Sequence, residues 1–264
     1  MGNNEILAHR GNFLPEGPIP TIERYDVPEN TLEAFDRAFK KNWGIETDVR
    51  QAKEGAFFIS HDEQSTRVAQ KSSQYVVPSL EDFFKLVQKY KKPFIAFQIK
   101  RSDDPESGIA VGRAVALGLQ EYGIQNSILF DATIEEAEIL HKEFPWLNLS
   151  VSCGEKNYSP TIYTPDQVLS DKFRSTFTSV WADEWKENGN IYNRDMFNNL
   201  KNAYPKGRID VISPELHYSE DHPLSKNIDE IKKLWEEILK WGTVGGICTD
   251  YPSKLEEILL KFII

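Results

Sequence analysis

The segment Glu5-Ile6-Leu7-Ala8-His9-Arg10-Gly11 passes from apolar residues into a histidine, an arginine and a glycine. A short apolar run followed by polar residues predicts a buried β-strand and the loop after it. An open, doubly wound sheet that binds a dinucleotide would have Gly-x-Gly-x-x-Gly after its first strand. Because His9-Arg10-Gly11 stands there instead, we favour a closed α/β barrel and keep the open sheet as the alternative.

Short apolar or β-branched runs alternate with segments of helical periodicity along the rest of the chain. We expect strands at Glu5–His9, Gly44–Val49, Phe57–Ser60, Phe94–Ile99, Ser127–Phe130, Leu147–Ser152, Ser179–Ala182, Ile209–Ser213 and Gly246–Thr249. We expect helices at Thr31–Lys41, Leu80–Tyr90, Gly108–Tyr122, Ile134–Glu143, Pro165–Phe173, Arg194–Ala203, Ile228–Trp241 and Ser253–Phe262. If Phe57–Ser60 extends the second strand, each strand is followed by one helix, which requires parallel pairing with right-handed crossovers. We therefore predict a single (β/α)8 TIM-barrel domain over residues 1–264.

Several predicted helices begin with capping signals. Ser79 precedes two acidic residues, and Thr133 is followed three residues later by Glu136, which is the pattern of a capping box. The proline-rich segment Asn12–Pro28 is long enough for a functional loop beside the first strand.

The charge balance narrows the possible functions. The chain has 31 Lys and Arg against 41 Asp and Glu, a formal net charge of -10, which is unlike the basic surface of a nucleic-acid-binding protein. No apolar run approaches the roughly 20 residues that a membrane-spanning helix needs. The first residues lack the pattern of a signal peptide, so we expect a cytoplasmic protein. Cys153 and Cys248 show no metal-binding spacing and are predicted to be buried free thiols.

Two carboxylates on the second strand carry most of the functional signal. In a strand, residues two apart point to the same face, so Glu46 and Asp48 lie side by side. Two carboxylates on one face repel each other, and a divalent cation such as Mg²⁺ or Ca²⁺ relieves that repulsion. The alternative is that both face solvent or pair with Arg10 and Arg50.

Histidines and cations end neighbouring strands. His9 and His61 close the first strand and the extension of the second, where an imidazole is suited to acid–base chemistry. Arg10 and Lys100 offer positive charge at the same rim, and an arginine can bind phosphate through two donors. Each of these residues alone is also compatible with a structural role.

Five blocks of this sequence resemble glycerophosphodiester phosphodiesterases. They are His9-Arg10-Gly11, Pro28-Glu29-Asn30-Thr31-Leu32-Glu33-Ala34-Phe35, Gly44-Ile45-Glu46-Thr47-Asp48-Val49, His61-Asp62 and Gly245-Gly246-Ile247-Cys248-Thr249-Asp250-Tyr251-Pro252. Their order and spacing match that family over the first hundred residues and near the end of the chain. Between these parts only the strand–helix rhythm matches.

The resemblance implies a phospholipase-C-like TIM barrel that uses one divalent metal ion, Mg²⁺ or Ca²⁺, to cleave a small phosphodiester, with a role in lipid metabolism. Carried over to this sequence, the motifs imply metal ligands at Glu46 and Asp48, an acid–base pair at His9 and His61, phosphate contacts at Arg10 and Lys100, and a site carboxylate at Glu29. The motifs do not indicate which histidine is the acid, which alcohol leaves or how many chains assemble.

The sequence departs from the family at the third metal ligand. The family has a glutamate two residues before the lysine, where this chain has Gln98. An amide oxygen still binds Ca²⁺ or Mg²⁺ but brings no charge. Asp131, Asp183 or Glu215, at other predicted strand ends, could replace that charge. If the amide merely weakens the site, a Gln98→Glu variant should bind metal more tightly.

We therefore predict an enzyme that hydrolyses a glycerophosphodiester-like substrate with a metal and two histidines. One alternative is a barrel with impaired metal binding that serves as a binding or regulatory domain for a phosphorylated ligand. Another is a phospholipase-like lyase that forms a cyclic phosphate.

Overall fold

The computed structural model describes residues 5–12, 27–62, 76–186, 191–217 and 222–262. Most of the predicted loop Asn12–Pro28 and residues 63–75 lie outside these ranges. The chain divides into two compact units, Ala8–Leu147 and Asn148–Ile264, and the second also includes Met1–Leu7.

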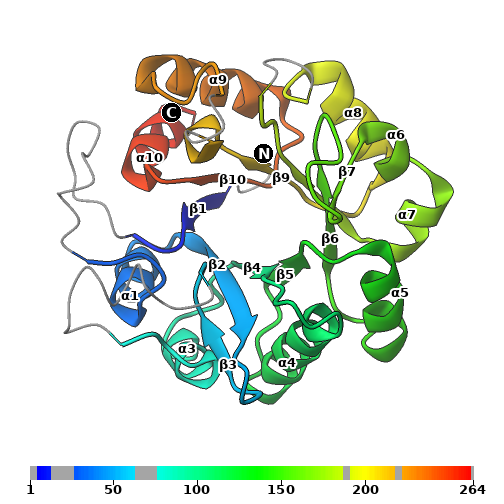
Figure 1. Cartoon of the computed structure of the whole chain (residues 1–264). Helices are drawn as coiled ribbons and strands as arrows, with labels where there is room; N and C mark the ends of the chain where they lie inside the picture. The colour runs from blue at the N-terminus through cyan, green and yellow to red at the C-terminus, as the bar shows by residue number, and fades with distance from the viewer. Residues whose placement is uncertain (1–4, 13–26, 63–75, 187–190, 218–221, 263–264) are drawn as a thin grey trace. The chain divides into compact units, whose positions relative to one another are not determined.

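The Ala8–Leu147 unit begins with the last residues of β1 (Glu5–His9). It continues through α1 (Leu32–Lys40), β2 (Gly44–Gln51), β3 (Phe57–Ile59), α3 (Leu80–Val87), β4 (Ile95–Ile99), α4 (Ser107–Glu121), β5 (Ser127–Phe130) and α5 (Ile134–Glu143). Its sheet has the order β5-β4-β2-β3. β4 pairs in parallel with both β2 and β5, so the three strands end at the same edge (Figure 1).

The Asn148–Ile264 unit repeats the alternation. It contains β6 (Leu149–Cys153), β7 (Ile162–Tyr163), α6 (Pro165–Val168), α7 (Asp171–Thr176), β8 (Ser179–Ala182), α8 (Arg194–Ala203), β9 (Ile209–Ile212), the short 3-10 helix η1 (Pro214–His217), α9 (Ile228–Trp241), β10 (Gly246–Thr249) and α10 (Pro252–Lys261). β8 pairs in parallel with β6 and β9, and β10 pairs in parallel with β9.

This succession of parallel strands and helices has the predicted fold class, a (β/α)8 TIM barrel. The predicted strand ranges agree closely with the observed ones. That residues 1–264 form a single domain stays a prediction. Within the described residues, no helix is both long and apolar enough to cross a membrane.

The predicted caps form, and they fix where the helices begin. The Ser79 side chain accepts a hydrogen bond from the backbone N–H of Asp82 at the start of α3. Thr133 and Glu136 form the reciprocal capping box of α5, as the sequence predicts. These side chains satisfy backbone donors that the first helical turn leaves without partners.

Aromatic side chains fill the space between the strands and helices of the Ala8–Leu147 unit. The ring centroids of Phe83 lie 5.1 Å from Phe35 and 5.7 Å from Phe97, both in edge-to-face geometry. These rings join α1, α3 and β4 in one buried core, and such pairs stabilise beyond the area they bury. Cys153 and Cys248 are buried free thiols, as predicted.

Two local predictions are wrong. Phe57–Ile59 is a separate strand that pairs antiparallel with the end of β2. The predicted helix Pro165–Phe173 is two short helices, because the chain caps α7 anew at Ser170.

Candidate active site

The predicted site residues gather at the carboxyl ends of neighbouring strands in the Ala8–Leu147 unit. His9 and Arg10 end β1, and Glu46 and Asp48 lie on β2. Gln98 lies on β4, where its Cα is the direct register partner of Asp48. Parallel pairing with Gln98 therefore brings together residues that are fifty positions apart in the sequence.

Glu46 and Asp48 are both buried, and Asp48 is 0% exposed. Burial and the neighbouring charge of Asp48 raise the pKa of Glu46. Burial also opposes ionisation of Asp48, but Lys100 and Arg10 hold its pKa well below the usual range. The two carboxylates thus compete for the same positive charges.

Asp48 is the point on which the cations converge. Lys100 Nζ lies 3.2 Å from Asp48 Oδ1, and Arg10 Nε lies 3.2 Å from Asp48 Oδ2. The other end of the Arg10 guanidinium contacts Glu29 Oε1 at 3.0 Å. Arg10, Glu29 and Lys100 therefore form one charged network with the β2 carboxylates.

The two histidines have different surroundings. His9 Nε2 lies 3.8 Å from Glu46 Oε2, which is an ion pair when the imidazole is protonated. His61 Nδ1 lies 2.8 Å from Asp62 Oδ1. Burial, with Arg10 and Lys100 nearby, lowers the pKa of His61 to about 4. His61 is therefore neutral at neutral pH, with a carboxylate oriented at one ring nitrogen.

The backbone turns after β1 and before α1 adopt left-handed conformations. Arg10 has φ 54° and Asn30 has φ 56°, and the backbone N–H of Asn30 donates to the Arg10 carbonyl oxygen at 2.9 Å. Gly11, with φ 88°, packs so closely on α1 that an added Cβ would lie 2.8 Å from the carbonyl carbon of Ala34. Strained non-glycine residues of this kind concentrate at functional sites.

Two further residues hold the site together: Asn30, to which the sequence assigned no role of its own, and Arg50, which was considered only as a partner of Glu46 and Asp48. The Asn30 amide donates to Asp48 Oδ2 at 2.8 Å and accepts from Thr47 Oγ1 at 3.0 Å. Arg50 donates to the carbonyl oxygens of His61 and Arg101. Asn30 lies inside the Pro28–Phe35 block, and Arg50 is two residues beyond Asp48. Their positions beside the other site residues could therefore have marked both as part of the site.

Gln98 has a carboxylate partner. Its Nε2 donates to Asp131 Oδ2 at 2.6 Å. Asp131 follows β5 directly and has φ 63°, another left-handed backbone in a residue other than glycine. Of the three carboxylates that the sequence offered in place of the missing charge, the structure pairs Asp131 with Gln98.

The other two, Asp183 and Glu215, belong to the Asn148–Ile264 unit, where their oxygens have partners. Asp183 binds His217 Nε2 through Oδ1 and accepts from Trp185 Nε1 through Oδ2. Glu215 accepts from the hydroxyls of Ser213 and Thr249. Both carboxylates therefore already have hydrogen-bond partners within their own unit.

The residues of the Ala8–Leu147 unit fit a divalent cation. Within the described residues, Asp48 Oδ1 is buried and accepts no hydrogen bond, although Lys100 lies beside it. Glu46, Asp48 and Gln98 offer the hard oxygen donors that Mg²⁺ and Ca²⁺ prefer. Within the described residues, no group of three or more His, Cys, Asp and Glu side chains is arranged to hold a metal ion.

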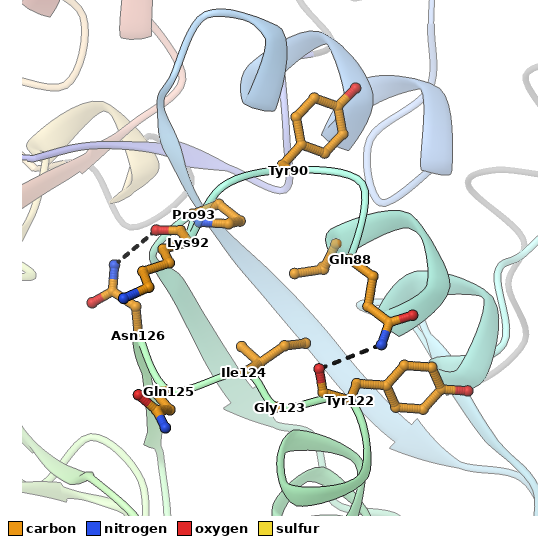
Figure 2. A pocket seen from close by; sticks show the side chains of 10 residues that line it. Gln88, Tyr90, Lys92, Pro93, Tyr122, Gly123, Ile124, Gln125 and Asn126 are labelled. Atoms are coloured by element: carbon orange, nitrogen blue, oxygen red, sulfur yellow. Dashed lines mark hydrogen bonds between the residues drawn. The ribbon is translucent and has the colours of Figure 1, made fainter.

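A cavity of about 690 Å³ in the same unit lies elsewhere. Figure 2 shows its lining, which includes Lys92 and Asn126 just before β4 and β5. Asn126 Nδ2 donates to the Lys92 carbonyl oxygen at 3.2 Å. The cavity thus lies at the amino ends of these strands, whereas Gln98 and Asp131 lie at their carboxyl ends.

The sequence was compared with known families and curated proteins. The model of the glycerophosphoryl diester phosphodiesterase family matches residues 23–158. This match includes Glu29, Glu46, Asp48, His61, Gln98 and Lys100. None of the curated proteins matches the chain significantly.

Solved structures show the same fold. A glycerophosphodiester phosphodiesterase from Parabacteroides distasonis is 17% identical, with a TM-score of 0.69 over 100% of this chain and 99% of its own. The enzyme from Thermotoga maritima is 18% identical, with a TM-score of 0.63 over 99% of each chain. That from Agrobacterium tumefaciens is 18% identical, with a TM-score of 0.58 over 96% of this chain and 99% of its own.

Proposed function

Because the chain belongs to the glycerophosphoryl diester phosphodiesterase family, we propose that it hydrolyses a small, glycerophosphodiester-like substrate with a divalent metal and two histidines. The observation that carries the proposal is the convergence of Arg10 and Lys100 on Asp48, with Glu46 and His9 beside them. Fixed cations and oxygen donors at one strand edge suit a phosphate group.

In this proposal Glu46, Asp48 and Gln98 hold the cation. When bound, Mg²⁺ or Ca²⁺ supplies Lewis-acid stabilisation of charge on the phosphoryl oxygens. Arg10 and Lys100 neutralise the remaining negative charge, and Glu29 holds Arg10 in position through the 3.0 Å contact between Nη1 and Oε1.

The histidines move the protons. A neutral His61 that donates Nδ1–H to Asp62 has the lone pair of Nε2 available to take a proton from the attacking water. The water oxygen forms a bond to phosphorus while the bond from phosphorus to the alcohol oxygen breaks. His9 then gives a proton to the leaving alkoxide, so the products are a phosphomonoester and a neutral alcohol.

The overall charge of -10 does not exclude an anionic substrate. Repulsion between separated charges is screened over about 8 Å at physiological salt. The local charge around the substrate phosphate in the site is determined by Arg10, Lys100 and the bound cation.

The experiment is hydrolysis of bis(4-nitrophenyl) phosphate and of a glycerophosphodiester, with Ca²⁺, Mg²⁺, Mn²⁺ or a chelator. We expect turnover with a divalent ion and none with chelator. His9→Ala and His61→Ala should each lower kcat by roughly 10²–10⁴-fold. Arg113→Ala, which removes an exposed pair with Glu143, is the matched control and should keep full activity.

The outcomes separate the alternatives. Full activity of both histidine variants, or activity in chelator, would contradict the proposed mechanism. Phosphorus NMR that shows a cyclic phosphate would identify a lyase. Tight binding of a phosphate ester without turnover under any metal would identify a binding domain.

A further inference from the structure

Gln98 lies between two carboxylates on neighbouring strands. Its Cα pairs with Asp48 on β2 and with Phe130, the last residue of β5. Asp131 follows Phe130 directly, and its carboxylate accepts a hydrogen bond from the Gln98 amide. Asp48, Gln98 and Asp131 therefore lie at the carboxyl ends of three adjacent parallel strands, all within the described residues.

The amide group of Gln98 has a defined orientation. Nε2 donates to Asp131 Oδ2 at 2.6 Å, which is short for a hydrogen bond from an amide and typical of one assisted by charge. The carbonyl oxygen is a separate substituent of the same planar carbon, so the hydrogen bond from Nε2 to Asp131 leaves it able to act as a donor to a cation.

The backbone of Asp131 contributes to this pairing. Its φ of 63° is a left-handed conformation that aspartate tolerates better than most residues. This left-handed turn comes directly after β5, and from it the Asp131 carboxylate contacts Gln98 on the neighbouring strand.

We propose that Asp131 replaces the missing third carboxylate of the metal site. It supplies the negative charge that Gln98 lacks, and it orients the Gln98 carbonyl oxygen as the third donor beside Glu46 and Asp48. The inference rests on the proposed function and deepens it, because it assigns the charge of the third ligand to the end of β5 instead of to β4.

The pairing changes what a Gln98→Glu variant should do. A glutamate at position 98 would place its carboxylate against that of Asp131, at the distance where Gln98 now donates a hydrogen bond. Two carboxylates in contact disfavour each other's ionisation. The single variant should therefore gain no metal affinity, whereas Gln98→Glu combined with Asp131→Asn restores one charge and one amide in exchanged positions.

The test is calorimetric titration of the metal-free protein with Ca²⁺ and with Mn²⁺, which needs no substrate. We expect Asp131→Asn to weaken binding roughly 10–100-fold, as loss of a residue that orients a metal ligand does. Asparagine tolerates a positive φ and keeps the size of the side chain, so the fold should persist. Asp36→Asn is the matched control, because Asp36 also accepts a side-chain hydrogen bond, from Tyr90, and lies on α1.

Affinity regained by the double variant, and by neither single variant, supports the inference. Wild-type affinity in Asp131→Asn, or tighter binding by Gln98→Glu alone, overturns it while leaving the proposed function intact. Failure of the wild-type protein to bind any divalent ion would overturn both the inference and the metal-dependent function, and the assay of hydrolysis in chelator identifies that case separately.

Discussion

Arg50 donates two hydrogen bonds to the carbonyl oxygen of His61, from Nε at 2.9 Å and from Nη2 at 2.7 Å. Its third donor, Nη1, binds the carbonyl oxygen of Arg101 at 2.9 Å. One guanidinium therefore joins the end of β3 to the segment after β4, next to Lys100. It fixes the backbone of His61, the proposed proton acceptor, relative to Lys100, a proposed phosphate contact.

We expect Arg50→Lys and Arg50→Ala to lower kcat by roughly 10–100-fold with little change in KM, since small displacements of catalytic groups cost that much. Lysine keeps the charge but cannot reproduce three donors in a fixed plane. The loss should largely disappear in a His61→Ala background if Arg50 acts through His61. Full activity of Arg50→Lys would show that only its charge matters, and Arg113→Ala serves as the control for loss of an arginine.

Asn30 is predicted to be essential for the position of Asp48. Asn30→Gly tolerates the φ of 56° but loses the 2.8 Å hydrogen bond to a buried carboxylate, at a cost of about 1.5–3 kcal/mol. Asn30→Ala should be about 1 kcal/mol less stable than Asn30→Gly, because alanine disfavours a positive φ. Asn30→Asp should be the least stable, since it places a second carboxylate at that distance. Urea denaturation of the metal-free protein measures this order, and equal stability of Asn30→Asp and wild type would contradict it.

The sequence alone was sufficient for most of the strands and helices and for the shared face of the two β2 carboxylates, because both depend on local periodicity. Glu46 and Asp48 are two residues apart on one strand, so their shared face follows from strand geometry. The contacts of Asp48 with Asn30 and of Gln98 with Asp131 were not predictable in the same way. The first depends on how the turn before α1 lies against β2, and the second on the pairing of β4 with β5, and no local pattern encodes either.

The difference between local sequence pattern and contacts made in the folded chain also explains the wrong predictions of secondary structure. The break between α6 and α7 depends on whether Ser170 caps a new helix, and the sequence Pro165–Phe173 permits one helix as well as two. The segment Phe57–Ser60 has the composition of an extension of the preceding strand, and local composition does not determine that the chain turns back and pairs antiparallel with β2.

Arg208 is expected to be the most important ion-pair residue for stability in the Asn148–Ile264 unit. Its Nη2 lies 2.7 Å from Asp210, which is 0% exposed, and its Nη1 lies 3.0 Å from Glu5. Arg208→Gln leaves a buried charge without its partner and should lower the free energy of unfolding by about 3–5 kcal/mol. The double variant that combines Arg208→Gln with Asp210→Asn should recover part of the lost free energy of unfolding. The exposed pair of Lys254 with Glu257 is the comparison, and Lys254→Gln should change stability by less than about 1 kcal/mol.

Glu215 should make stability depend on pH. Burial raises the pKa of its carboxyl to about 7, despite hydrogen bonds from Ser213 and Thr249. The folded state therefore binds a proton that the unfolded state, with a glutamate pKa near 4.3, releases. The stabilising contribution is fully present below that unfolded value and is lost as the pH rises through about 7.

Glu215→Gln carries no titrating group, so its stability relative to wild type should rise by up to roughly 3 kcal/mol between pH 4.5 and pH 8. Urea denaturation at a series of pH values measures the difference. Glu257→Gln is the control, because the hydrogen bond from Lys254 lowers the pKa of the exposed Glu257 and moves its titration away from this interval. A constant difference between Glu215→Gln and wild type from pH 4.5 to pH 8 would mean that the buried carboxyl is ionised throughout, held by the hydroxyls of Ser213 and Thr249.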